Sequence, residues 1–165
     1  MINAAITGWG KCLPPAVLSN DDLGQLFETS DEWITSRTGI RERRVSHVGL
    51  GEMAYVASAR ALACAGIEGS AIELIVFGSC SYDDQVPNMA SGIQLQIGAD
   101  HAASMDVNTA CTSFLFALST ANARLALIGV RWAISPCQTS IALRVIALGS
   151  SLPKAGKMWL SIMWQ

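Results

Sequence analysis

Cys111 is the residue whose type and surroundings most clearly suggest chemistry in this 165-residue chain. It lies in the segment NTACTSF, residues 108–114, which follows AASMDV and leads into an apolar stretch typical of a helix. The thiolate is the nucleophilic form of cysteine, and a helix N-terminus stabilises its negative charge. Most unpaired cysteines are small core residues, however, and position alone favours that interpretation over a nucleophile.

The other four cysteines lack this setting between a strand and a helix, so we interpret them as structural. They are Cys12, Cys64, Cys80 and Cys137, and no two of the five cysteines form a CxxC pair. The spacing therefore predicts neither a zinc site nor a disulfide framework, and no metal is expected. A reducing, cytoplasmic location is the default for such a chain.

The composition is apolar, with 51% hydrophobic residues, 15% charged residues and a mean hydropathy of +0.36. The length suffices for one domain with a sizeable core. No membrane span is expected because the apolar runs are short and interrupted by Arg131 and Arg144. The first residues lack the pattern of a signal peptide. Residues 107–165 carry bases and no acid, but these bases are too widely spaced to predict a nucleic-acid partner.

Strands alternate with helices along residues 1–123, which predicts an α/β domain with a mainly parallel sheet. Ser19 or Asn20 is expected to cap the first helix and Ser30 the second, which Gly39 closes. The stretch ELIVFGSC is continuously apolar, as a buried parallel strand should be, and GWGKCLPP is expected to be a loop. Predicted strands are residues 4–8, 73–80 and 103–107, and predicted helices are residues 21–27, 31–38, 53–64, 88–97 and 111–123.

The last predicted helix has no polar face. Its large apolar side chains spread around the helix axis: Phe114, Leu115, Phe116 and Leu118. A helix that is apolar all round is normally buried on every side. We therefore expect more than one layer of structure to pack on it.

The segment TSDEWITSRTGIRER, residues 29–43, resembles a signature of the β-ketoacyl-acyl-carrier-protein synthase III family, which are condensing enzymes of the thiolase superfamily. Further segments resemble the family in the same order: ITGWGKCLPP, AGIEGSAIELIVFGSC, SYDDQVPNMA and DVNTACTSFLFALSTANA. The resemblance covers residues 2–123. It implies the N-terminal half of the thiolase-like layered α/β/α/β/α fold, with a mainly parallel mixed sheet and a buried central helix.

The resemblance also implies roles for single residues. Cys111 matches the nucleophile, which takes an acyl group from a coenzyme A thioester; coenzyme A is thus part of a substrate, and no cofactor is implied. Trp33 and Arg37 match the pair that holds the adenine of coenzyme A, and their spacing of four places them on one helical face. Without the motif, a surface tryptophan covered by an arginine would be the simpler interpretation. Thr29 is a weaker candidate contact. Val86 falls near the acyl pocket, where a residue smaller than the family's frequent aromatic would admit a longer or branched acyl group.

The activity implied by the resemblance is acyl transfer to cysteine, followed by decarboxylative condensation with malonyl carrier protein in fatty-acid or related biosynthesis. Acyl-coenzyme A and acyl carrier protein would be the partners, and the complete enzyme is expected to be a homodimer in the cytoplasm. The condensation needs a histidine and an asparagine from far downstream. The chain has only His47 and His101, and both are expected to lie in loops.

From Arg124 onward the sequence no longer resembles the family. It contains no acid, three of the five tryptophans and no clear period for helix or strand. We therefore expect a thiolase-like domain over residues 1–123 and a tail over residues 124–165 that is out of frame or replaced, with a genuine divergent tail as the alternative. The chain itself is expected to be incomplete and inactive.

Two other functions stay open. A catalytically silent fragment could retain only coenzyme A binding or dimerisation. The chain could also derive from another thiolase-superfamily acyltransferase of natural-product biosynthesis.

Overall fold

The computed structural model describes the backbone of residues 4–128, 133–139, 142–150 and 158–159, and the side chains of residues 6–124. In chain order the elements are β1 (Ala4–Cys12), β2 (Ala16–Ser19), α1 (Asn20–Leu26), α2 (Asp31–Thr38), β3 (Glu42–Val45), α3 (Leu50–Ala65), η1 (Gly69–Ala71), β4 (Leu74–Gly78), α4 (Met89–Gln96), β5 (Ala103–Val107), η2 (Ala110–Thr112), α5 (Ser113–Ile128), β6 (Ala133–Thr139), β7 (Ala142–Ser150) and β8 (Met158–Trp159).

The main sheet is mixed. Its strand order is β1-β8-β7-β6-β4-β5 over the described residues. β4 pairs in parallel with β5 and β6, whereas β7 is antiparallel to β6 and to β1. Every residue of β4 is buried, which confirms the parallel, buried strand predicted from its unbroken apolar sequence.

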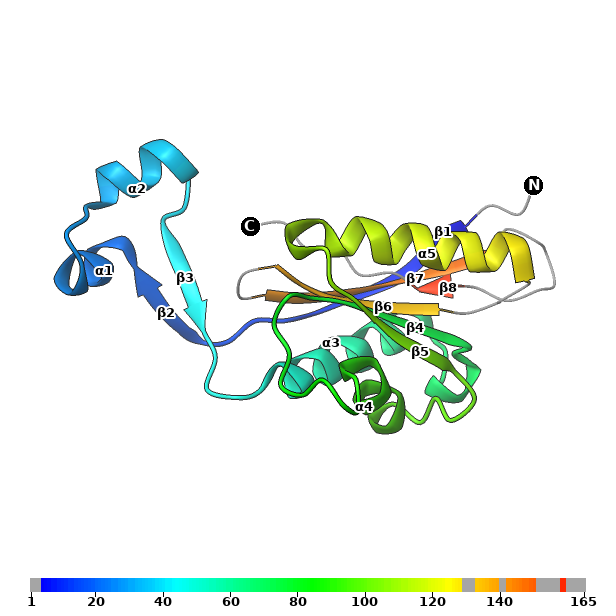
Figure 1. Ribbon diagram of the computed structural model, residues 1–165. Coiled ribbons are helices and arrows are strands. Elements are labelled where there is room, and N and C mark those ends of the chain that lie inside the picture. The colour runs from blue at the N-terminus through cyan, green and yellow to red at the C-terminus, as the bar shows by residue number, and fades with distance from the viewer. Residues whose placement is uncertain (1–3, 129–132, 140–141, 151–157, 160–165) are drawn as a thin grey trace.

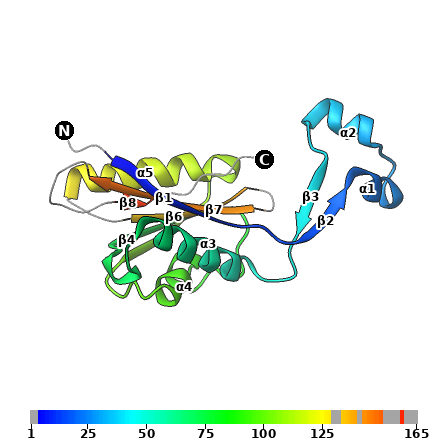
Figure 2. The same ribbon diagram turned by 180° about the vertical axis from the view of Figure 1, so that it is seen from behind.

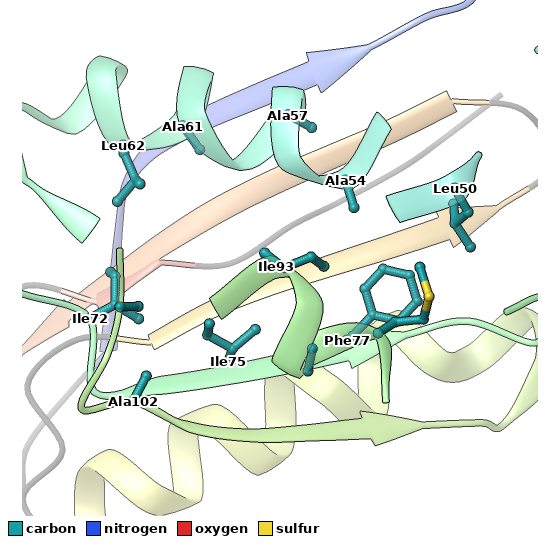
Figure 3. Packing of buried hydrophobic residues seen from close by; sticks show 13 residues of the cluster. Leu50, Ala54, Ala57, Ala61, Leu62, Ile72, Ile75, Phe77, Ile93 and Ala102 are labelled. Atoms are coloured by element: carbon teal, nitrogen blue, oxygen red, sulfur yellow. The ribbon is translucent and has the colours of Figure 1, made fainter. Parts of the chain in front are cut away.

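Helices cover both faces of this sheet. α3 and α4 lie on one face and α5 lies on the other (Figures 1 and 2). Between β4 and the α3–α4 layer, Ile75 and Phe77 of the strand project toward Ile93 of α4 and the small side chains of α3 (Figure 3). The small residues of α3 also let β1 approach closely, because a Cβ atom at Gly10 would lie 2.1 Å from the carbonyl oxygen of Ala57.

α5 is covered on one face only within the described chain. Ser113, Ala117 and Ala121, spaced four residues apart, are fully buried on the side that packs against β4 and β6. Leu115 and Phe116 point away from that side and are 59% and 53% exposed. We expected α5 to be buried on every side, but it is buried only on the side that faces the sheet. No second layer of the described chain packs on its outer side.

Residues 16–45 form an arm that projects from one end of the body (Figures 1 and 2). The arm consists of the antiparallel pair β2–β3 together with α1 and α2. Both predicted caps are confirmed: Ser19 forms a capping box with Asp22, and Ser30 accepts a hydrogen bond from the backbone N–H of Trp33. Gly39 ends α2 with a φ of 73°, as expected for a glycine after a helix.

Several element boundaries differ from those predicted. β1 runs to Cys12, so GWGKC belongs to the strand and not to a loop, and α5 continues to Ile128. β2 and β3 were not predicted because each has four residues and no alternation of buried and exposed positions.

The segment after Arg124 contains strands that its sequence did not predict. β6 lies beside β4, and β7 pairs with β1 along the whole length of that strand. Both strands lie in the interior of the sheet, where a strand needs no alternating pattern. That residues 124–165 are a tail that is out of frame or replaced, with a boundary at Arg124, stays a prediction.

Candidate active site

Cys111 lies in a short 3-10 turn, η2, between β5 and α5. β4 and β5 run in parallel, so their carboxyl ends meet at one edge of the sheet, and Cys111 follows directly after that edge. Ligands of open α/β sheets bind at such edges. The cysteine is exposed to solvent, as a nucleophile must be, and the α-helix itself begins two residues later, at Ser113.

The turn that carries Cys111 is held by its neighbours' side chains. The Oγ of Ser113 accepts from the backbone N–H of Thr109 at 2.9 Å and donates to the carbonyl oxygen of Ala110 at 2.8 Å. The hydroxyl of Thr112 donates to the carbonyl oxygen of Thr109 at 2.7 Å. Ala110 has a φ of 48°, a left-handed conformation that costs about 1–3 kcal/mol for a residue other than glycine. These bonds fix a strained backbone that presents Cys111.

Ser113 is the functional residue that sequence reasoning missed. It is fully buried, and its hydroxyl is satisfied by the two bonds that close the turn. The signal was present as a polar residue directly before the apolar stretch of residues 114–118. Such a residue needs hydrogen-bond partners when it is buried, so it could have been assigned to the turn.

Gly78 supports the turn from the end of β4. A Cβ atom at this position would lie 2.9 Å from the carbonyl oxygen of Ser113 and 3.2 Å from its Cβ. The strand backbone therefore lies directly against the first turn of α5. Glycine is needed here for close approach and not for a special φ.

Trp33 and Arg37 lie together on α2 in the arm. The guanidinium carbon of Arg37 is 4.5 Å from the centroid of the Trp33 ring, which is a cation–π contact. Trp33 is 53% exposed. A third flat group between them would need about 7 Å, twice the contact distance of about 3.5 Å between stacked carbon atoms. The two side chains cover each other in this structure, so a ligand could enter between them only if Arg37 moved.

The weaker candidate in the arm, Thr29, is placed differently from Trp33. Its hydroxyl oxygen is buried and has no hydrogen-bond partner. A contact between this hydroxyl and a ligand would require the α1–α2 connection to open. The predicted role of Thr29 stays a prediction.

Val86 projects from the connection between β4 and α4 and is 91% exposed. Two carboxylates anchor this connection around it. Asp83 accepts from the first two backbone N–H groups of α3 at 3.1 and 2.7 Å, and Asp106 accepts from the first two of α4 at 3.0 and 2.9 Å. Val86 thus stands on a fixed loop, but its side chain lines nothing in the described part of its own chain.

Tyr82 ties the same connection back to β4. Its hydroxyl donates to the carbonyl oxygen of Ser79 at 2.6 Å. Burial raises the pKa of Tyr82, and the negative charge of Asp106 raises it further. The hydroxyl therefore stays protonated, and remains a donor, at neutral pH.

The two histidines are both exposed, and neither lies in the turn of Cys111. His101 precedes β5 whereas Cys111 follows it, so the two residues lie at opposite ends of a strand of five residues. At about 3.3 Å per residue that strand alone separates them by about 16 Å. His101 is therefore too far away to take a proton from Cys111. His47 lies in the connection between β3 and α3.

The candidate residues fall into two separate places. Cys111 belongs to the body, and Trp33, Arg37 and Thr29 belong to the arm; the start of α5 lies at the end of the body nearer to the arm (Figure 1). Among the side chains that are described, no three of histidine, cysteine, aspartate or glutamate gather into a possible metal site. No helix within the described residues has the length and apolar character to cross a membrane.

The mixed sheet with helices on both faces, and with Cys111 between β5 and α5, has the thiolase-like α/β fold of the solved structures that it matches. A solved structure of this class, 3-oxoacyl-[acyl-carrier-protein] synthase III from Aquifex aeolicus, matches with a TM-score of 0.86 and 27% sequence identity. The match covers 93% of this chain and 55% of that structure.

The similarity in sequence to curated relatives covers a shorter part of the chain than the similarity in fold. Beta-ketoacyl-[acyl-carrier-protein] synthase III 2 of Vibrio cholerae is 55% identical over 118 residues, which are 72% of this chain and 33% of the relative. Beta-ketoacyl-[acyl-carrier-protein] synthase III of Roseiflexus castenholzii is 42% identical over 120 residues, 72% of this chain and 36% of the relative. No protein-family profile matches the chain.

Over the matched residues this chain is similar to the beta-ketoacyl-[acyl-carrier-protein] synthase III enzymes. The chain spans about a third of the length of these curated relatives. The likeness in fold extends over more of the chain than the likeness in sequence, 93% against 72%.

Proposed function

We propose that this chain carries the acyl-accepting part of a synthase III acyltransferase, with Cys111 as the nucleophile. The observation that carries the proposal is the exposed cysteine on a strained, hydrogen-bonded turn at the carboxyl ends of two parallel strands. This turn lies in the part of the chain that is related to the synthase III enzymes. The first reaction is transfer of an acyl group from acyl-coenzyme A to the cysteine.

In that step the Cys111 sulfur, as the thiolate, attacks the carbonyl carbon of the thioester. A new carbon–sulfur bond forms, the bond to the coenzyme A sulfur breaks, and coenzyme A leaves as a thiolate that takes up a proton from solvent. The carbonyl oxygen carries negative charge in the transition state, and backbone N–H groups of the turn are the donors available to it. Each such donor is worth about a hundredfold or more in rate.

Coenzyme A is proposed to dock on Trp33 and Arg37. Because these two side chains cover each other, Arg37 would swing away so that the adenine could stack on the ring. A guanidinium is weakly hydrated and planar, so it can stack equally well on the outer face of the base. Val86 on its anchored loop is proposed to face the acyl group, and acyl carrier protein is the proposed second substrate.

Condensation with a malonyl thioester is proposed only for a longer protein that also contains the other two thirds of the relatives' length. Such a protein is proposed to act as a homodimer in the cytoplasm. The separation of His101 from Cys111 favours a second candidate function for the chain as it stands. That function is coenzyme A binding without condensation, because His101 lies at the opposite end of β5 from Cys111.

The acyl transfer is tested by incubating the chain with acetyl-coenzyme A and measuring the intact mass, followed by peptide mapping. We expect one acetyl group on Cys111. Cys111→Ala should abolish the adduct, whereas Cys64→Ala, which removes another exposed cysteine, on α3, should leave it unchanged. Acetylation spread evenly over the exposed cysteines would contradict the proposal.

Coenzyme A docking is tested separately by calorimetry. Trp33→Ala and Arg37→Ala should each weaken binding by about 1 kcal/mol or more, because each removes one stacking surface. Trp9→Ala is the matched control, since Trp9 is 57% exposed but lies on β1 in the body. Equal losses for Trp9→Ala and Trp33→Ala would place the ligand elsewhere.

A further inference from the structure

Asn20 is a buried polar residue at the centre of the arm. It is the first residue of α1 and is 1% exposed. A buried amide side chain costs free energy unless its donors and its acceptor are all bonded. The structure satisfies each of them, and the partners come from several elements of the arm.

The amide nitrogen of Asn20 donates to a carboxylate oxygen of Asp31 at 2.7 Å and to the carbonyl oxygen of Ile40 at 2.7 Å. Its amide oxygen accepts from the guanidinium of Arg43 at 2.6 Å. Asp31 is the first residue of α2, Ile40 follows the C-cap of α2, and Arg43 lies on β3. One side chain therefore holds both ends of α2 and fixes that helix to β3.

α2 has little else to hold it. Ile34 is its only buried residue, so apolar packing fixes the helix weakly. The bond between Asp31 and Thr35, at 3.1 Å, lies within the helix and does not fix the helix to the rest of the arm. The position of α2 therefore depends mainly on the hydrogen bonds of Asn20.

We propose that Asn20 is the positioning residue of the coenzyme A docking surface: it fixes α2, and through α2 the place of Trp33 and Arg37. This inference rests on the proposed function for the identity of the ligand. Asn20 itself would touch no ligand, because it is buried beneath the helix that carries those two side chains.

The chemistry of an amide explains why asparagine stands here. Aspartate would lose both donors and would face the carboxylate of Asp31, and a leucine of similar shape would leave Asp31, Ile40 and Arg43 without their partner. The hydrogen bond from Asn20 also lowers the pKa of Asp31, with the bond from Thr35 as the next cause. Asn20 thus stabilises the ionised form of the residue that begins α2.

The first test needs no ligand. The indole N–H signal of Trp33 is followed by two-dimensional NMR of the 15N-labelled chain and assigned through Trp33→Phe. Asn20→Ala should move this signal, because α2 is released from β3. Ser19→Ala is the matched control. It removes the cap of α1, one residue away, but the side chain of Ser19 bonds to Asp22 of α1 and not to α2, so Trp33 should keep its signal.

A double substitution separates positioning from stability. In Asn20→Asp combined with Asp31→Asn, the donor and the acceptor of one bond change places, and Arg43 keeps its acceptor. Ile40 still loses its donor in this pair, so the Trp33 signal should return only part of the way, whereas Asn20→Asp alone should not bring it back. A Trp33 signal that is unmoved in Asn20→Ala, or that moves equally in Ser19→Ala, would overturn the inference. A pair whose Trp33 signal lies as far from the wild-type position as that of Asn20→Asp alone would also overturn it.

Coenzyme A binding then gives the functional readout. If the wild-type chain binds, Asn20→Ala should raise the dissociation constant on the order of tenfold and Ser19→Ala less than about twofold. Equal effects of the two substitutions would reduce Asn20 to a stabilising residue. A wild-type chain that binds no coenzyme A, with a Trp33 signal that still depends on Asn20, would refute the proposed ligand and uphold the control of α2 by Asn20.

Discussion

Replacing Gly78 with alanine should disturb the turn of Cys111 from behind. The new Cβ atom would lie 2.9 Å from the carbonyl oxygen of Ser113, 3.0 Å from its carbonyl carbon and 3.2 Å from its Cβ. Ordinary carbon contacts are about 3.5–4.0 Å, so the strand and the helix must separate by roughly half an ångström. The neighbour is backbone, so no side-chain rotation can relieve the contact.

The magnitude follows from two opposing terms. Overpacking of this kind costs about 1–3 kcal/mol. Alanine also restricts the unfolded chain and returns about 0.4–1 kcal/mol. We expect a net loss of about 1–2 kcal/mol in the free energy of unfolding, together with a changed rate of alkylation at Cys111, because Ser113 holds that turn.

The assay is urea unfolding followed by circular dichroism, combined with iodoacetamide labelling of Cys111 monitored by peptide mass spectrometry. Gly92→Ala is the matched control. Gly92 lies within α4 and has nothing within 4 Å of its Cβ position, so alanine should stabilise the chain by about 0.5–1 kcal/mol. If Gly78→Ala left both stability and labelling unchanged, β4 would not support the turn that carries Cys111.

Three further results are expected. Asp106→Ala should lower the free energy of unfolding by about 1–2 kcal/mol in urea titrations, because the start of α4 loses the acceptor of two backbone N–H groups; an unchanged midpoint would contradict this. Hydrogen bonds hold the pKa of Asp31 below its usual 3.8, so the stability that ionised Asp31 gives the arm is present above pH 3.8 and is lost as pH falls below that value. Amide hydrogen exchange of α2 should therefore accelerate at low pH. Asp31→Asn should remove most of this pH dependence. Limiting iodoacetamide should label Cys111 faster than the exposed Cys64, and equal rates would make Cys111 an ordinary surface thiol.

Much of the arm and the buried parallel strand β4 could be predicted from short-range sequence patterns. Ser30 and Gly39 bound α2 as expected because caps act through bonds to the nearest backbone groups, and β4 is apolar without a break because both of its faces are covered. The helix boundaries were less accurate, since α3 begins at Leu50 with a glycine at its N-cap and takes its acceptor from Asp83, more than thirty residues away. A contact at that distance leaves no local signal.

The candidate site could be predicted in part. Cys111 stood out because of its place between a strand and a helix, and the spacing of Trp33 and Arg37 indicated their shared face. Three other features depend on which elements the fold brings together. They are the hydrogen bonds of Ser113 in the Cys111 turn, the close contact of Gly78 with α5, and the hydrogen bonds of Asn20 to α2 and β3. Asn20 illustrates the difference, because its sequence context suggested only a helix cap, whereas its bonds reach residues 11, 20 and 23 positions away.

The pairing of β1 with β7 has a consequence for the order in which the molecule can be assembled. Paired residues of these two strands are 131 to 146 positions apart in the chain, between Cys12 and Leu143 at one end and Ala4 and Ser150 at the other. At a ribosomal rate of about 5–20 residues per second, β1 must wait roughly 7 to 29 s for this partner. α3 is complete long before then, and its small residues accept Gly10 of β1 at close range. During synthesis α3 can therefore shelter the first strand, which would otherwise present unpaired backbone groups to other chains.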